Sequence, residues 1–121
     1  MKENNIKDQS YELSVLGVKI FIQMKAQKEY VLSKQFLKAI TSIGANVEEA
    51  YDAESKKDFI HKLSISLKEA RESMYWVRLI DDTALVNIDT REIKLQLNSV
   101  TAILVSIIKS SKINLGTGEK N

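Results

Sequence analysis

The stretch SIGANVEEAYDAESKKDF, residues 42–59, decides the fold, because it contains the end of one predicted helix and the start of the next. Apolar residues recur through and before it at alternating spacings of four and three, the pattern of a helix with one face on a core. Ser55 and Asp58 then form a capping box that begins a new helix. The pattern predicts one helix from an N-cap at Ser33 to about residue 54, with the core stripe Phe36, Ile40, Ile43, Val47 and Ala50.

The same periodicity predicts the other helices. The helix that follows the capping box has the stripe Ile60, Leu63, Leu67, Ala70, Met74 and Val77. A further box, Asp89 with Glu92, begins a helix over residues 90–110 with the stripe Ile93, Leu97, Val100, Leu104 and Ile107.

The first helix, over residues 10–28 with Ser10 as its cap, has two apolar stripes, and one core can use only one of them. The stripes are Leu13, Leu16, Ile20 and Met24 on one side and Tyr11, Val15, Val18 and Ile22 on the other.

Four helices with short connections predict an all-α protein, an antiparallel up-down-up-down four-helix bundle. A chain of 121 residues is long enough for one such domain. We expect residues 10–111 to form it, with a frayed segment at 1–9 and a disordered tail at 112–121.

Composition limits the classes of function. The chain has 18 basic and 16 acidic residues, a formal charge of +2 and no cysteine, which predicts a cytoplasmic protein and is unlike a dedicated nucleic-acid binder. The apolar run at 13–24 is interrupted by polar residues, so we expect no membrane partner. The single histidine, His61, has Asp58 rather than Glu three residues before it, short of a di-iron ligand set. We therefore expect no metal, no cofactor and no enzymatic activity.

Apolar residues outside the core stripes predict an oligomer. Ile65, Trp76 and Leu79 fall on the outer face of the third predicted helix, where a large apolar side chain has no use in a single chain. With the second stripe of the first helix they form a candidate homo-oligomer interface: Tyr11, Val15, Val18, Ile22, Ile65, Trp76 and Leu79.

Small and polar residues follow one flank of the second helix. Gly44 and the alanines near it predict close approach of a neighbouring helix. We expect the Asn46 amide to pair with Glu49 or with a carboxylate of the third helix, because polar groups near a core are normally paired. Replacing Asn46 by Leu would then disturb assembly or register more than helix content.

Six short motifs carry a resemblance to a known family: Gln35 in SKQ, SIGAN at 42–46, EEA at 48–50, SKKDF at 55–59, KEARES at 68–73, and Tyr75-Trp76. With these the chain resembles the four-helix-bundle proteins encoded in intervening sequences of bacterial 23S rRNA genes, the S23 family. The motifs cover the second and third helices densely, and the fourth hardly at all. Many relatives carry a proline before the second helix, where this chain has EYVLS.

The resemblance implies an antiparallel bundle that assembles into a ring-like homo-oligomer, pentameric in the known structures of the family. A related branch, the accessory variability protein of diversity-generating retroelements, binds nucleic acid and a reverse transcriptase through a basic surface. The resemblance also marks five signature residues: Ser42, Asn46, Glu49, Glu69 and Trp76. Together with Glu72 they would form a polar junction between the second and third helices.

The sequence thus predicts a non-enzymatic homo-oligomer that binds RNA weakly and without sequence preference. An alternative stays open, a protein–protein assembly scaffold without nucleic-acid binding. Nearby acidic residues can make the same lysines an ordinary solvated face, and only Tyr30 and Tyr51 look free to stack on a base. The candidate nucleic-acid-binding residues are Lys34, Lys38, Lys56, Lys57 and Lys62.

Overall fold

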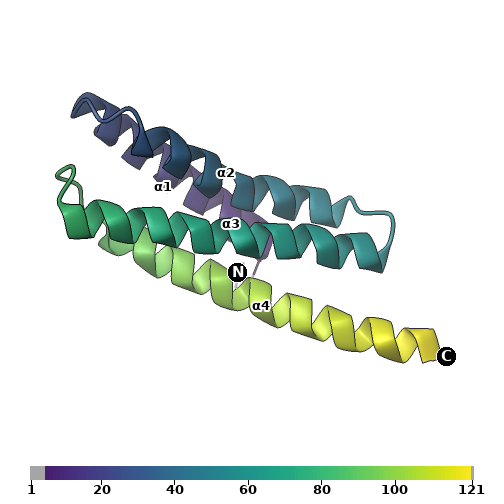
Figure 1. Cartoon of the computed structure of the whole chain (residues 1–121). Coiled ribbons are helices and arrows are strands. Elements are labelled where there is room, and N and C mark those ends of the chain that lie inside the picture. The colour runs from purple at the N-terminus through teal and green to yellow at the C-terminus, as the bar shows by residue number, and fades with distance from the viewer. Residues whose placement is uncertain (1–4, 121) are drawn as a thin grey trace.

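The structure is a computed structural model that describes residues 5–120. Within this range it contains four helices and no strands: α1 (Ile6–Ala26), α2 (Leu32–Tyr51), α3 (Lys56–Thr83) and α4 (Arg91–Lys120). α1 and α3 each pack on both α2 and α4, so the four helices surround one core (Figure 1). The prediction of an all-α fold with four helices is confirmed.

The core follows the predicted stripes closely. All five stripe residues of α2 are buried, and α1 turns Leu13, Ile20 and Met24 inward. Some positions differ at the edges, where Leu67, Met74 and Ile107 are half-buried. In α4 the buried position after Leu104 is Ile108 rather than Ile107, because the spacing of four between Val100 and Leu104 repeats once more.

α1 begins at Ile6 rather than at Ser10. The Asn5 side chain accepts a hydrogen bond from the Asp8 backbone N–H at 3.2 Å, which makes Asn5 the N-cap. Ser10 is a buried residue inside the helix, and its hydroxyl donates to the Lys7 carbonyl. Of the segment expected to fray, residues 6–9 are therefore helical, while residues 1–4 lie outside the described range.

α4 is longer than predicted. It continues to Lys120 through most of the segment expected to be a disordered tail, and Asn121 lies outside the described residues. The first turns of α1 lie beside the middle of α4, where the Ser99 hydroxyl donates to the Gln9 side chain, and the far end of α4 projects past the other helices (Figure 1).

α2 begins at Leu32, and the predicted N-cap at Ser33 is wrong. The cap is supplied by Glu29, whose carboxylate accepts the backbone N–H groups of Val31, Leu32 and Ser33. Burial alone would raise the pKa of Glu29, but these backbone hydrogen bonds outweigh it and lower the pKa. Sequence spacing missed this cap because Lys28, with a φ of 66°, bends the chain so that Glu29 faces the helix start.

Side-chain hydrogen bonds fix the start of α3 and the connection from α3 to α4. Ser55 is the N-cap of α3 as predicted, with its hydroxyl accepting from the Asp58 N–H at 3.0 Å. Asp81 joins the end of α3 to the start of α4 by accepting hydrogen bonds from the Thr90 hydroxyl and the Lys94 ammonium group. The bond from Lys94 is the main reason that the pKa of Asp81 is lowered.

The predicted box at Asp89 and Glu92 forms only in part. Asp89 accepts from the backbone N–H of Arg91 at 3.0 Å and from its guanidinium group. The guanidinium bond, followed by the backbone bond, lowers the pKa of Asp89 to about 2. Glu92 instead accepts from the Gln96 side chain in the next turn of α4.

Glycines allow α1 and α2 to approach closely. A Cβ atom on Gly17 would lie 2.5 Å from Cγ2 of Ile40, so no side chain fits there. A Cβ atom on Gly44 would lie 3.1 Å from the Ser14 hydroxyl and 3.2 Å from the Ser10 carbonyl, which is tight but tolerable. Close approach at Gly44 was predicted; the tighter contact at Gly17 was not.

Gly17→Ala should destabilise the protein. The added methyl group collides with Ile40 in a packed core, which costs about 1–3 kcal/mol and exceeds the gain in helix propensity. Gly44→Ala is the matched control, because the same gain of about 1 kcal/mol there meets only a mild contact. Urea unfolding followed by circular dichroism should show a lower free energy of unfolding for Gly17→Ala alone. Equal effects of the two substitutions would contradict the close contact at Gly17.

Asp81→Asn should lower the free energy of unfolding at pH 7 by about 1 kcal/mol, because it removes the charge that binds Lys94. Since folding lowers the pKa of Asp81, this stabilisation is complete above the ordinary value of 3.8 and is lost as the pH falls through the folded pKa. Wild type and variant should therefore converge at a pH below the folded pKa of Asp81. Asp82→Asn, which changes an exposed neighbour, controls for net charge. A difference between wild type and Asp81→Asn that stays constant as the pH falls from 7 through the folded pKa would be inconsistent with this role.

Candidate functional site

The family signature residues of α2 are bonded within their own helix. The Ser42 hydroxyl donates to the Lys38 carbonyl at 2.6 Å, and the Asn46 amide donates to the Ser42 carbonyl at 2.8 Å. The predicted pairing of Asn46 with a carboxylate is therefore wrong. Asn46 is half-buried, and its side-chain amide finds its hydrogen-bond acceptor in the preceding turn of its own helix.

The remaining junction residues form separate local contacts rather than one network. Glu49 crosses from α2 to α3 by pairing with Lys62 at 2.9 Å, and this hydrogen bond raises the pKa of Lys62. Glu72 accepts from the Trp76 indole N–H at 3.2 Å, one turn away on α3. Glu69 takes part through its backbone carbonyl, which accepts from the buried Ser73 hydroxyl. The only side-chain link between helices in this set is thus Glu49–Lys62.

The α3 members of the candidate interface are less exposed than predicted. Trp76 is half-buried and packs against the hydrophobic core, while its ring also meets Tyr75 edge-on at 5.2 Å. Ile65 and Leu79 are half-buried as well. The placement of Trp76 on the outer face is corrected accordingly: the indole is large enough to reach from the flank of α3 to the core edge.

The α1 members, in contrast, are all exposed, the two ends of the set more than its middle. Tyr11 and Ile22 are 67% and 59% exposed, and Val15 and Val18 are 38% and 39% exposed. A shallow hollow lies among them, lined by Tyr11, Ser14, Val15, Val18 and Lys19. We refer to Tyr11, Val15, Val18 and Ile22 as the α1 stripe. It is a continuous apolar surface along one helix, which water alone covers in the single chain.

The candidate nucleic-acid-binding lysines form two groups rather than one. Lys34 and Lys38 are exposed on the first half of α2, whereas Lys56 and Lys57 are exposed in the first turn of α3. The length of α2 places these groups about 25 Å apart, at a rise of 1.5 Å per residue. Lys62 belongs to the second group, but its ammonium group is already paired with Glu49.

The second lysine group borders an aromatic pair. Tyr51 and Phe59 meet edge to face at 5.3 Å, with the Lys7 and Lys56 ammonium groups each 5.8 Å from one of the two ring centres. A hollow of about 320 Å³ opens beside them and includes Glu54 in its lining. Lys7 also pairs with Glu48 at 3.6 Å. Sequence reasoning named Tyr51 but missed Lys7 and Phe59, whose proximity only the packing of α1, α2 and α3 reveals.

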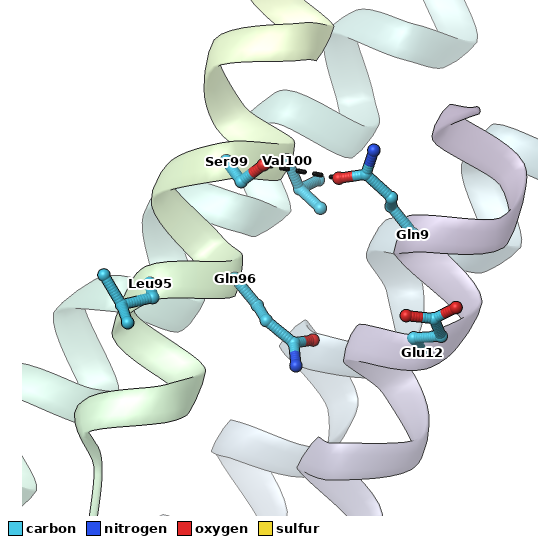
Figure 2. A pocket seen from close by; sticks show the side chains of 6 residues that line it. All are labelled: Gln9, Glu12, Leu95, Gln96, Ser99 and Val100. Carbon is cyan, nitrogen blue, oxygen red and sulfur yellow. Dashed lines mark hydrogen bonds between the residues drawn. The ribbon is translucent and has the colours of Figure 1, made fainter. Parts of the chain in front are cut away.

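A groove of about 270 Å³ lies between α1 and α4, and its lining includes both polar and apolar residues (Figure 2). Glu12 and Gln96 extend from opposite helices into the space between them, and the Ser99 hydroxyl donates to Gln9 at 3.3 Å. This lining offers amides and a carboxylate, but it contains no nucleophile paired with a base. The groove is therefore a partly polar seam between two packed helices.

Two further features bear on function. Among residues 5–120 no three His, Cys, Asp or Glu side chains cluster so that they could hold a metal ion, and His61 is exposed. The Arg91–Leu115 segment of α4 is long and apolar enough to cross a membrane by length and composition alone. The exposed large apolar residues of this segment are Leu95, Val105 and Ile113.

Both a family of proteins and solved structures match this chain. Residues 2–106 match the family described as 23S rRNA-intervening sequence protein. A crystal structure of a protein with unknown function from the S23 ribosomal protein family of Bacteroides thetaiotaomicron is similar, with 43% sequence identity and a TM-score of 0.83. The similarity covers 90% of this chain and 99% of that one. A search of curated proteins gives no match. The family match spans most of the chain and the structural match nearly all of it, and the chain belongs to the 23S rRNA-intervening sequence protein family.

Proposed function

We propose that this protein is a non-enzymatic, cytoplasmic homo-oligomer that binds RNA weakly and without sequence preference. In this proposal each protomer is an antiparallel up-down-up-down bundle, and the protomers form a ring, five-fold as the family resemblance implies. Short connections between helices that pack on their neighbours support the antiparallel arrangement. The related accessory variability protein provides the model for nucleic-acid binding through a basic surface.

The observation that carries the proposal is the exposure of the α1 stripe. Burying a large apolar side chain contributes roughly 1.5–3 kcal/mol, so four such residues on one face give a substantial driving force for association. The half-buried Ile65, Trp76 and Leu79 on α3 can add to the covered area. Conformational and association entropy oppose this gain, so the assembly depends on protein concentration.

RNA binding is supported by the exposed lysines, because an oligomer would present several copies of them. Each protomer presents two exposed lysine pairs, Lys34 with Lys38 and Lys56 with Lys57. One pair attracts phosphate only weakly, but an oligomer repeats both pairs and turns weak contacts into a multivalent one. The second pair lies beside Tyr51 and Phe59, which offer an aromatic surface to a base.

Light scattering coupled to size exclusion should give a mass that is a multiple of 13.7 kDa, five for a single ring. Tyr11→Ser with Ile22→Ser should lower this mass without loss of helix content, since both side chains are exposed and leave the core intact. Tyr30→Ser, at another exposed tyrosine, is the control. A wild-type protein that stays a monomer at micromolar concentration would refute the proposed assembly.

Fluorescence anisotropy with unrelated RNA and DNA oligonucleotides should show sequence-independent binding at 50 mM salt. About four phosphate contacts predict a loss of affinity of roughly 50-fold at 200 mM salt. Lys34→Glu with Lys38→Glu, and separately Lys56→Glu with Lys57→Glu, should weaken binding. Lys109→Glu with Lys112→Glu makes the same charge change on exposed residues of α4 and should have less effect.

Two results would overturn the RNA proposal. One is no binding by the oligomeric wild type at 50 mM salt, in which case the assembly scaffold without nucleic acid replaces it. The other is equal weakening by all three double variants, which would show a response to net charge rather than to a site.

A further inference from the structure

The α1 stripe has the pattern of a coiled-coil seam. Tyr11, Val15, Val18 and Ile22 are spaced 4-3-4, which corresponds to alternating d and a positions of a heptad. The structure leaves all four exposed, on the side of α1 opposite Leu13 and Ile20. We propose that α1 pairs in an antiparallel manner with α1 of a second copy of this chain. This proposal rests on the self-assembly proposed above and specifies one of its contacts.

Charges beside the stripe determine the direction of pairing. Asp8 and Glu12 precede the middle of the stripe, whereas Lys19 and Lys25 follow it. An antiparallel pair centred between Val15 and Val18 sets Tyr11 opposite Ile22 of the second copy and Asp8 opposite its Lys25. Glu12 and Lys19 are one heptad apart on the same edge of α1. Glu12 lines the groove beside α4 in the single chain, and in the pair its carboxylate would turn to Lys19 of the second copy. In a parallel pair Asp8 would instead face Asp8 of the second copy and Lys25 would face Lys25, and both contacts are repulsive.

The hollow on α1 supports the same contact. Four of its five lining residues, Tyr11, Ser14, Val15 and Val18, are successive d, g, a and d positions of the heptad. Four residues in this diamond are what receives a single side chain of the facing helix in a coiled coil. The hollow is therefore a preformed hole in the seam, and the small Ser14 side chain keeps it open.

The paired charges also favour a second copy over an anionic membrane surface. A helix that binds such a surface carries basic residues along its whole polar border, whereas the first half of α1 has Asp8 and Glu12 there. The antiparallel contact is isologous, with the same surface used by both copies. Because a two-fold contact cannot close a five-fold ring, the ring contact then falls to the half-buried α3 residues, and the α1 pair joins two rings face to face.

Disulfide cross-linking tests the geometry directly, because the chain contains no cysteine of its own. Tyr11→Cys and Ile22→Cys change exposed residues, so each variant should keep the helix content of the wild type. When the two variants are mixed and oxidised, a 11–22 cross-linked dimer should form. Neither variant should cross-link alone, because antiparallel copies of either position lie about 16 Å apart along the helices.

A charge exchange provides the second measurement. Lys19→Glu and Glu12→Lys should each raise the dissociation constant of the oligomer about tenfold, since two symmetric attractions become repulsions. The double variant should restore it to within about twofold, because the pair is reversed rather than lost. Glu12 and Lys19 are exposed and lie about 10 Å apart within one helix, so restoration reports the contact between copies.

The outcomes separate this inference from the proposed function. An oligomeric wild type with neither 11–22 cross-links nor restoration by charge exchange overturns the α1 pairing and leaves assembly in place. Cross-links of Tyr11→Cys with itself, or of Ile22→Cys with itself, also overturn it, because they indicate a parallel pair. A monomeric wild type overturns both proposals.

Discussion

The contact between Gly17 and Ile40 fixes the rest of the structure, because α1 could otherwise pack in two ways. Its two apolar stripes are similar in length and hydrophobicity, and either could cover a core. Only the face that contains Gly17 lets the backbone approach α2 closely enough for Ile40 to fill the space of a missing Cβ atom. Leu13, Ile20 and Met24 accompany Gly17 into the core, and the α1 stripe is left in solvent. Packing inside the protomer therefore determines the surface available for assembly.

Polar contacts link the helices near their ends, on both sides of the core. Glu29 caps the start of α2 by accepting backbone N–H groups. Asp81 joins α3 to α4 by accepting from the charged Lys94 side chain. In both cases these bonds replace the carboxylate's hydrogen bonds to water. On the opposite side, Lys62 and Glu49 link α2 to α3. These contacts lie beside connecting segments, so they fix where each helix starts while the core fixes how the helices face one another.

Helix periodicity predicted the four helices and most core positions, because a buried helix face requires apolar residues at a regular spacing. It missed Ile6 and Ile80, which are buried near helix ends. It failed where a contact depends on the path of the chain between helices. Glu29 caps α2 from outside the helix, and no spacing rule distinguishes it from the Ser33 cap that was predicted. Asn46 was expected to bond across a seam and instead bonds one turn back, a choice that sequence leaves open. Lys7 and Phe59 meet at Tyr51 only through packing, so this part of the candidate surface could not be found from sequence.

Assembly depends on the outward stripe of α1, which we propose is covered by another copy of the chain in solution. Hydroxyl-radical labelling followed by mass spectrometry tests it on the unmodified protein, with Tyr30 as an internal reference that is similarly exposed in the single chain. Labelling of Tyr11 and Ile22 should fall as protein concentration rises, while labelling of Tyr30 stays constant. Labelling of Tyr11 that remains as strong as that of Tyr30 at every concentration would contradict the proposed contact.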